Sequence, residues 1–156
     1  MTRIINEYII TCDMGYKKMK AFEMIDHTAD ISIKVYGQNL KELFQNAAFG
    51  MFNILADLEG IKTSTELEIK VEALDKEELL IEWLDELLYD FYTKHIIFSK
   101  FDITELTDTK LTACVKGRFV GENRNRLKTE IKAVTRHNLH IEKKEDHYEV
   151  QIIFDV

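Results

Sequence analysis

The sequence predicts an α+β fold in which two helices pack on a largely antiparallel β-sheet, as a single two-layer domain. Two segments, 39–57 and 75–94, have apolar residues at helical spacing. The segments around them alternate apolar and polar residues, as half-buried strands do. Beyond residue 94 only strands are predicted, which is typical of the α+β class. A length of 156 residues suits one domain.

The first predicted elements are a short strand at 20–24 and a half-buried strand that begins at Ile31. Asn39 and Glu42 have the spacing of a capping box, which predicts the start of a helix. The apolar stripe of this helix continues to about Asp57.

The second helix is predicted to begin after Asp75, and its wide apolar stripe includes Trp83, which we expect in the core. Both helices can then lie on a single sheet. A turn is expected near Glu145 and Asp146. The remaining strands are predicted at 67–73, 96–103, 111–119, 129–142 and 148–155.

The charge of the chain is unevenly distributed. A net charge of −7 argues against a protein whose main activity is wrapping nucleic acid. Residues 116–144, however, contain nine Lys/Arg and three Glu, so they carry +6 and the rest of the chain carries −13. This segment is either a solvated strand pair of mixed charge or a patch that faces phosphate or a partner.

Cysteine usage and hydropathy predict a cytoplasmic protein. Cys12 and Cys114 lie far apart and form no C-x-x-C motif, so neither a zinc site nor a redox motif is indicated. No apolar run is long enough for a membrane-spanning helix, and the N-terminus lacks a signal-peptide cleavage pattern. We therefore expect no membrane partner.

Carboxylates occur at the ends of two predicted strands. Asp30 precedes the strand at Ile31, and Asp155 is followed by the α-carboxylate of Val156. Hard divalent cations such as calcium, magnesium or manganese take oxygen ligands of this kind. The three groups form a site if the last strand lies beside the one that begins at Asp30; otherwise their charges repel each other.

The stretch DHTAD at 26–30 also has a purely structural interpretation. Asp26 and Thr28 can accept hydrogen bonds from nearby backbone N–H groups and so close a turn between two strands. His27 would then only pack against its neighbours. Composition alone does not choose between the turn and the metal site.

The chain contains, in this order, the blocks DHTADISIKVYG, LKELFQNAAFGMFNIL, LLIEWLDELLYDF, LKTEIKAVTRHNL and IIFDV. Taken together, these five blocks resemble the archease family. The resemblance extends over residues 19–156 and leaves 1–18 as an N-terminal extension, with Met19 as an alternative start. Archeases are small α+β metal-binding proteins that assist the RtcB-type RNA ligase in tRNA splicing and RNA repair.

The resemblance implies roles for particular residues. Asp30, Asp155 and the Val156 carboxylate would bind a divalent metal, with calcium expected first and magnesium or manganese as alternatives. Glu130 is an acid that the family associates with activity; otherwise it is a solvent-facing or salt-bridged glutamate. Asp26 and His27 would support the turn or the ligands rather than bind the metal.

The function that the resemblance implies is that of a protein cofactor, not an enzyme. Such a protein promotes guanylylation of the ligase and its multiple turnover, and contacts tRNA only through the ligase. Arg136 replaces a common aromatic residue, and Arg124 and Arg126 replace an arginine–histidine pair, so these three are candidates for RNA or partner contacts. The alternatives are a general chaperone or a binding protein associated with RNA modification. An independent phosphoesterase lacks a recognisable nucleophile motif.

Overall fold

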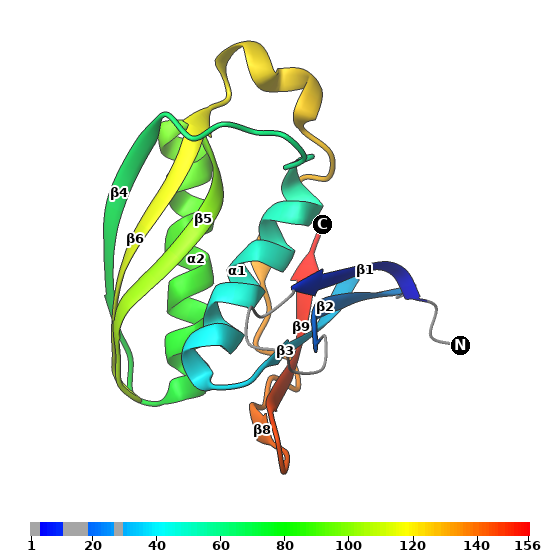
Figure 1. Cartoon of the computed structure of the whole chain (residues 1–156), viewed down its shortest axis with the longest axis vertical. Helices are drawn as coiled ribbons and strands as arrows, with labels where there is room; N and C mark the ends of the chain where they lie inside the picture. Colours follow the sequence, from blue (N-terminus) through cyan, green and yellow to red (C-terminus); the bar gives the residue numbers. More distant parts are fainter. Residues whose placement is uncertain (1–3, 11–18, 27–29) are drawn as a thin grey trace.

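Two antiparallel sheets pack against two long helices in this computed structural model, which describes residues 4–10, 19–26 and 30–156 (Figure 1). The first sheet has the order β1 (Ile4–Ile10), β2 (Met19–Asp26), β3 (Ile31–Gly37), β9 (Tyr148–Asp155) and β7 (Ala133–Val134), and β8 (Glu142–Lys143) also pairs with β9. The second has the order β4 (Thr65–Glu72), β6 (Lys110–Phe119) and β5 (Ile96–Leu106). The helices are α1 (Leu40–Leu55), α2 (Lys76–Lys94) and a short 3-10 helix, η1 (Gly121–Arg126).

Both long helices begin at the capping residues that the sequence predicts. The Asn39 side chain accepts a hydrogen bond from the backbone N–H of Glu42 at 2.8 Å. Asp75 accepts one from the N–H of Glu78, also at 2.8 Å. Each cap satisfies an N–H that has no partner within the helix, which is worth about 1 kcal/mol. α2 ends at Lys94, and the residue that caps it, His95, has a φ of 56° in the left-handed region.

α1 is buried along most of its length because it contacts a sheet on either side. It packs on β3 and β2 of the first sheet and on β5 of the second. Phe52 contacts the rings of Phe91, Phe98 and Phe101, with centroids 5.5–5.9 Å apart. Trp83 of α2 is fully buried, and its Nε1 donates to the Phe44 carbonyl at 3.0 Å, so its predicted place in the core is confirmed.

The α+β class, the two helices and the antiparallel strands are confirmed, but the strands form two sheets where the sequence predicts one. The reason is the apolar surface of α1, which extends around the helix and needs cover on both sides.

β1, which lies within the predicted extension 1–18, pairs with β2. Within the described residues, no helix combines the length and apolar character needed to cross a bilayer.

The predicted strand at 129–142 is wrong. Only β7 and the first residue of β8 within this range pair as strands. The segment still contributes to the core through Ile131, Val134 and Ile141. These residues are three and seven apart, so they do not keep the two-residue period of a strand. The turn at 145–146 is confirmed between β8 and β9.

Candidate functional site

The pairing of β3 with β9 places the strand ends that carry Asp30 and Asp155 beside each other. The two strands are antiparallel, and their last pair at this end is Ile31 with Phe154; Asp30 and Asp155 are the next residue on either side of that pair. A register that continued by one residue would place the two side chains on the same face of the sheet. The condition on which the predicted carboxylate site depends, that these two strands are neighbours, is therefore met.

The end of β9 is held from its other side by β7. Asp155 pairs with Ala133, and the Asp155 carbonyl accepts a hydrogen bond from the N–H of Lys132 at 2.7 Å. Val156 is partly buried and packs against the core. The backbone on which both carboxylates of this end depend is thus fixed by two neighbouring strands.

The donor set fits a hard cation. Asp30 and Asp155 supply two carboxylates, and the Val156 terminus would supply a third. Ligands that are all oxygen suit calcium, magnesium or manganese, whereas structural zinc prefers cysteine and histidine. Over the described part of the chain, no group of three or more His, Cys, Asp or Glu side chains is placed so that it could hold a metal ion. His27 and the side chain of Asp26 lie outside the described residues.

Glu130 is exposed at the start of a segment whose backbone is fixed by Tyr92 of α2. The Tyr92 hydroxyl donates to the carbonyl of Ile131 at 2.8 Å and accepts from its N–H at 3.1 Å. Burial raises the pKa of Tyr92, the bond to Ile131 lowers it, and the charge of Glu130 raises it further. The sequence gives no sign of this role, because nothing local distinguishes Tyr92 from other tyrosines of the helix.

A small pocket of about 230 Å³ lies beside Glu130, where the C-terminal ends of α1 and α2 meet the chain that follows η1. Glu130 and Tyr92 both line it, together with apolar side chains from each helix. Glu130 and Asp155 belong to the same region of the fold, because Glu130 lies three residues before Ala133, the partner of Asp155.

Two cations of the basic segment 116–144 bind backbone carbonyls: Lys128 binds in the last turn of α1, and Arg126 binds in the loop that follows the helix. Arg126 donates to the carbonyls of Asp57 at 3.1 Å and Glu59 at 2.7 Å. Lys128 Nζ donates to the Asn53 carbonyl at 2.7 Å. Carbonyls at a helix C-terminus lack partners within the helix and attract positive charge. These side chains therefore have a structural role.

Other cations of the same segment pair with carboxylates. Arg136 Nε donates to Glu78 at 3.0 Å and 3.2 Å, and its guanidinium lies 3.9 Å from Glu82. Lys144 lies 2.8 Å from Glu142. Arg124 is exposed in η1. The structure thus favours mixed charge over a continuous basic patch.

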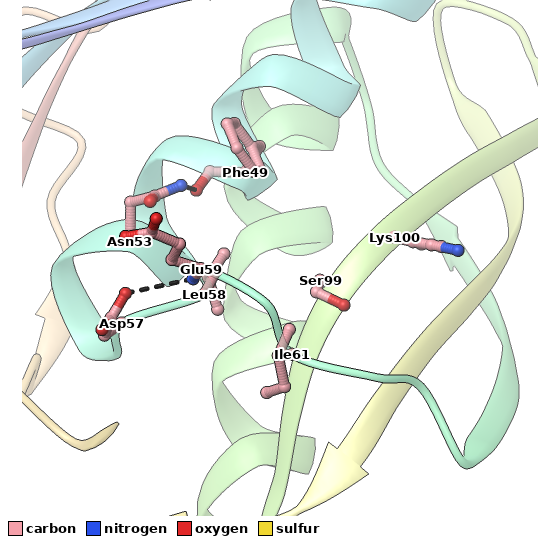
Figure 2. A pocket seen from close by; sticks show the side chains of 8 residues that line it. All are labelled: Phe49, Asn53, Asp57, Leu58, Glu59, Ile61, Ser99 and Lys100. Carbon is pink, nitrogen blue, oxygen red and sulfur yellow. Dashed lines mark hydrogen bonds between the residues drawn. The ribbon is translucent and has the colours of Figure 1, made fainter. Parts of the chain in front are cut away.

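A larger pocket, of about 380 Å³, lies between the end of α1, the loop that follows it and β5 (Figure 2). Phe49, Leu58 and Ile61 line it with apolar surface, and Ser99 lies where the β5–β6 register shifts. Asp57 Oδ1 accepts from the N–H of Glu59 at 3.0 Å and so shapes the loop. Its lining contains neither histidine nor cysteine, so it holds no Ser–His or Cys–His pair.

The family model of the Archease protein family (MTH1598/TM1083) matches residues 22–156, which include the whole β3–β9 pair. The chain belongs to the archease family. A protein archease of Methanosarcina mazei is 37% identical over 88% of this chain and 97% of its own length. One of Sulfurisphaera tokodaii is 34% identical over 88% of this chain and 100% of its own length.

Solved archease-like structures have the same fold. Protein 1598 of Methanobacterium thermoautotrophicum superposes with a TM-score of 0.74 at 34% identity, over 87% of this chain and 99% of that one. A Thermotoga maritima protein named as an archease and possible chaperone gives 0.59 at 26% identity, over 85% and 94%. β1 precedes the residues that match the archease family model.

Proposed function

We propose that this archease is a metal-binding accessory protein that activates an RtcB-type RNA ligase in the cytoplasm, promoting guanylylation and multiple turnover of the ligase in tRNA splicing and RNA repair. Family membership supports the proposal. The observation that carries it is the β3–β9 register, whose last pair, Ile31 with Phe154, is followed directly by Asp30 on one strand and by Asp155 and Val156 on the other. Two carboxylates in such an arrangement repel each other, and a bound cation would offset that repulsion.

Asp30, Asp155 and the Val156 carboxylate would hold the cation, most consistently calcium. A divalent cation supplies positive charge that can stabilise or position phosphoryl oxygens. The residues of this chain keep the ligands in place: β3 and β7 fix the end of β9, and Tyr92 fixes the backbone next to Glu130. The covalent chemistry belongs to the ligase, and the net charge of −7 favours contact with tRNA through the ligase.

A chaperone function is the second candidate, since the Thermotoga maritima relative is named a possible chaperone. A general chaperone needs a broad exposed apolar surface. The large exposed apolar side chains of the described residues instead come from several different elements; they are Leu74, Tyr89, Tyr92, Phe119 and Leu127. If the protein were a general chaperone, it would suppress the aggregation of an unfolded client in a light-scattering assay.

The proposed function is tested by turnover of the cognate ligase on tRNA halves, with and without this protein. We expect wild-type protein to convert a single turnover into many. Asp30→Asn and Asp155→Asn should lose that stimulation, because they remove ligand charge without changing side-chain size. Asp102→Asn, at an exposed acid on β5, is the matched control and should keep it. A ligase that turns over equally well without this protein would refute the proposal.

The metal is tested separately by calorimetry with calcium and manganese. Both ligand variants should lose affinity, and affinity should fall on acidification, because carboxylates bind a metal only when they are ionised. A C-terminal tag converts the Val156 carboxylate to an amide and should weaken binding, whereas an N-terminal tag should not. A C-tagged protein that keeps its full calcium-induced melting shift would remove Val156 from the site.

A further inference from the structure

The outward face of α2 changes from acidic to aromatic along its length. Glu78, Glu82, Asp85, Tyr89 and Tyr92 follow one another at intervals of three or four residues, so they form one stripe on the helix. None of the five belongs to the fully buried face of the helix. Tyr89 is 60% exposed and Tyr92 is 39% exposed, so both rings are accessible from solvent.

The aromatic half of this stripe lines an open pocket of about 440 Å³. Asp85, Glu86, Tyr89 and Tyr92 contribute to it, with Lys132 from the segment before β7. Tyr92 also lines the smaller pocket that contains Glu130. Tyr92 therefore contributes to the lining of both hollows.

The chain itself shows which chemistry the stripe accepts. Arg136 lies on its acidic half, with a forked hydrogen bond to Glu78 and Glu82 within 3.9 Å. A guanidinium is favoured there because it matches carboxylates in charge and geometry. The pocket at the aromatic half of the stripe also has carboxylates, and it adds tyrosine rings against which a cation can pack. Burial raises the pKa of the half-buried Asp85, and an incoming cation would reduce that cost.

We propose that this pocket is the surface with which the protein docks on its partner, and that it takes an arginine or lysine of the ligase flanked by apolar residues. The inference rests on the proposed function, because it assigns the docking surface used for activation. A protein segment fits better than RNA, since three carboxylates face the site and would repel phosphate. Exposed tyrosines beside charged residues are typical of side chains that dominate protein interfaces.

The test is the affinity of the ligase for wild-type protein and two variants, measured by calorimetry. Tyr89→Ala removes the most exposed aromatic anchor, and Glu86→Lys reverses one charge at the pocket. Both should weaken binding by about tenfold or more and reduce stimulation at limiting protein. The matched controls are Phe119→Ala, an equally exposed aromatic residue on β6, and Glu122→Lys in η1; both should bind as wild type.

The outcomes separate this inference from the proposed function. If wild-type protein stimulates the ligase and both pocket variants bind it with unchanged affinity, only the docking surface is overturned. The same holds if the variants lose affinity for tRNA or for a second copy of the chain instead. If wild-type protein neither binds nor stimulates the ligase, both proposals fail. Thermal melts of each variant, expected to match wild type, exclude misfolding as the cause of weaker binding.

Discussion

Replacing Tyr92 with phenylalanine should destabilise the protein by about 2 kcal/mol. The hydroxyl makes two hydrogen bonds to the backbone of Ile131, a residue that is fully buried. A hydrogen bond of this kind contributes about 1 kcal/mol net, and a buried group left without a partner costs at least as much. Because Tyr92 is 39% exposed, water can reach part of the site and solvate the groups left without a partner. The expected loss in the free energy of unfolding therefore stays near the contribution of two hydrogen bonds.

Thermal and urea unfolding measure this loss. For a chain of this length 1 kcal/mol corresponds to about 2–4 °C, so the midpoint should fall by about 4–8 °C. Tyr89→Phe, one turn earlier on the same helix and 60% exposed, is the matched control and should change the free energy of unfolding by less than about 0.5 kcal/mol. Hydrogen exchange at the Ile131 amide should also become faster in Tyr92→Phe. Equal stability of the two variants would refute the proposed anchoring of the segment next to Glu130.

Two further predictions concern stability. Hydrogen bonds to Asp146 at 2.6 Å and Glu149 at 3.1 Å raise the pKa of His147, so its stabilising charge is fully present below pH 6.5 and is lost as the pH rises through the raised value. Melts between pH 5.5 and 8 should therefore show wild type losing about 1–3 °C relative to His147→Gln, and parallel curves would contradict the pairing. Gly117→Ala should cost about 1–3 kcal/mol in urea unfolding, because its Cβ would clash with the Ile97 carbonyl; wild-type stability would mean that this backbone can move.

The helices could be predicted because their signals are local. Asn39 and Asp75 mark the starts through contacts only three residues long, and the apolar stripes are continuous. The predicted bounds, 39–57 and 75–94, agree with α1 and α2 to within two residues. The division into two sheets was harder to foresee, since it depends on which strands pair and not on the pattern of any one strand.

The candidate site depends on long-range pairing, and its prediction was accordingly conditional. Asp30 and Asp155 are far apart in sequence, and only the β3–β9 register shows that the strand ends next to them pair. Arg126 and Arg136 look like free charges in the sequence, but their partners are distant carbonyls and carboxylates. Tyr92 was missed for the same reason, because its hydroxyl bonds to a residue 39 positions away.

The pairing of Ile31 with Phe154 also affects how the chain reaches its native state. These partners are 123 positions apart, and bringing such distant segments together costs about 4 kcal/mol of chain entropy before any contact forms. Pairing at this range slows folding, because the cost is met early and the stabilising contacts follow later. The sequence contains no proline, so the common cause of refolding phases that last tens of seconds is missing. Any slow refolding step should therefore be insensitive to prolyl isomerase and should coincide with the pairing of β3 and β9.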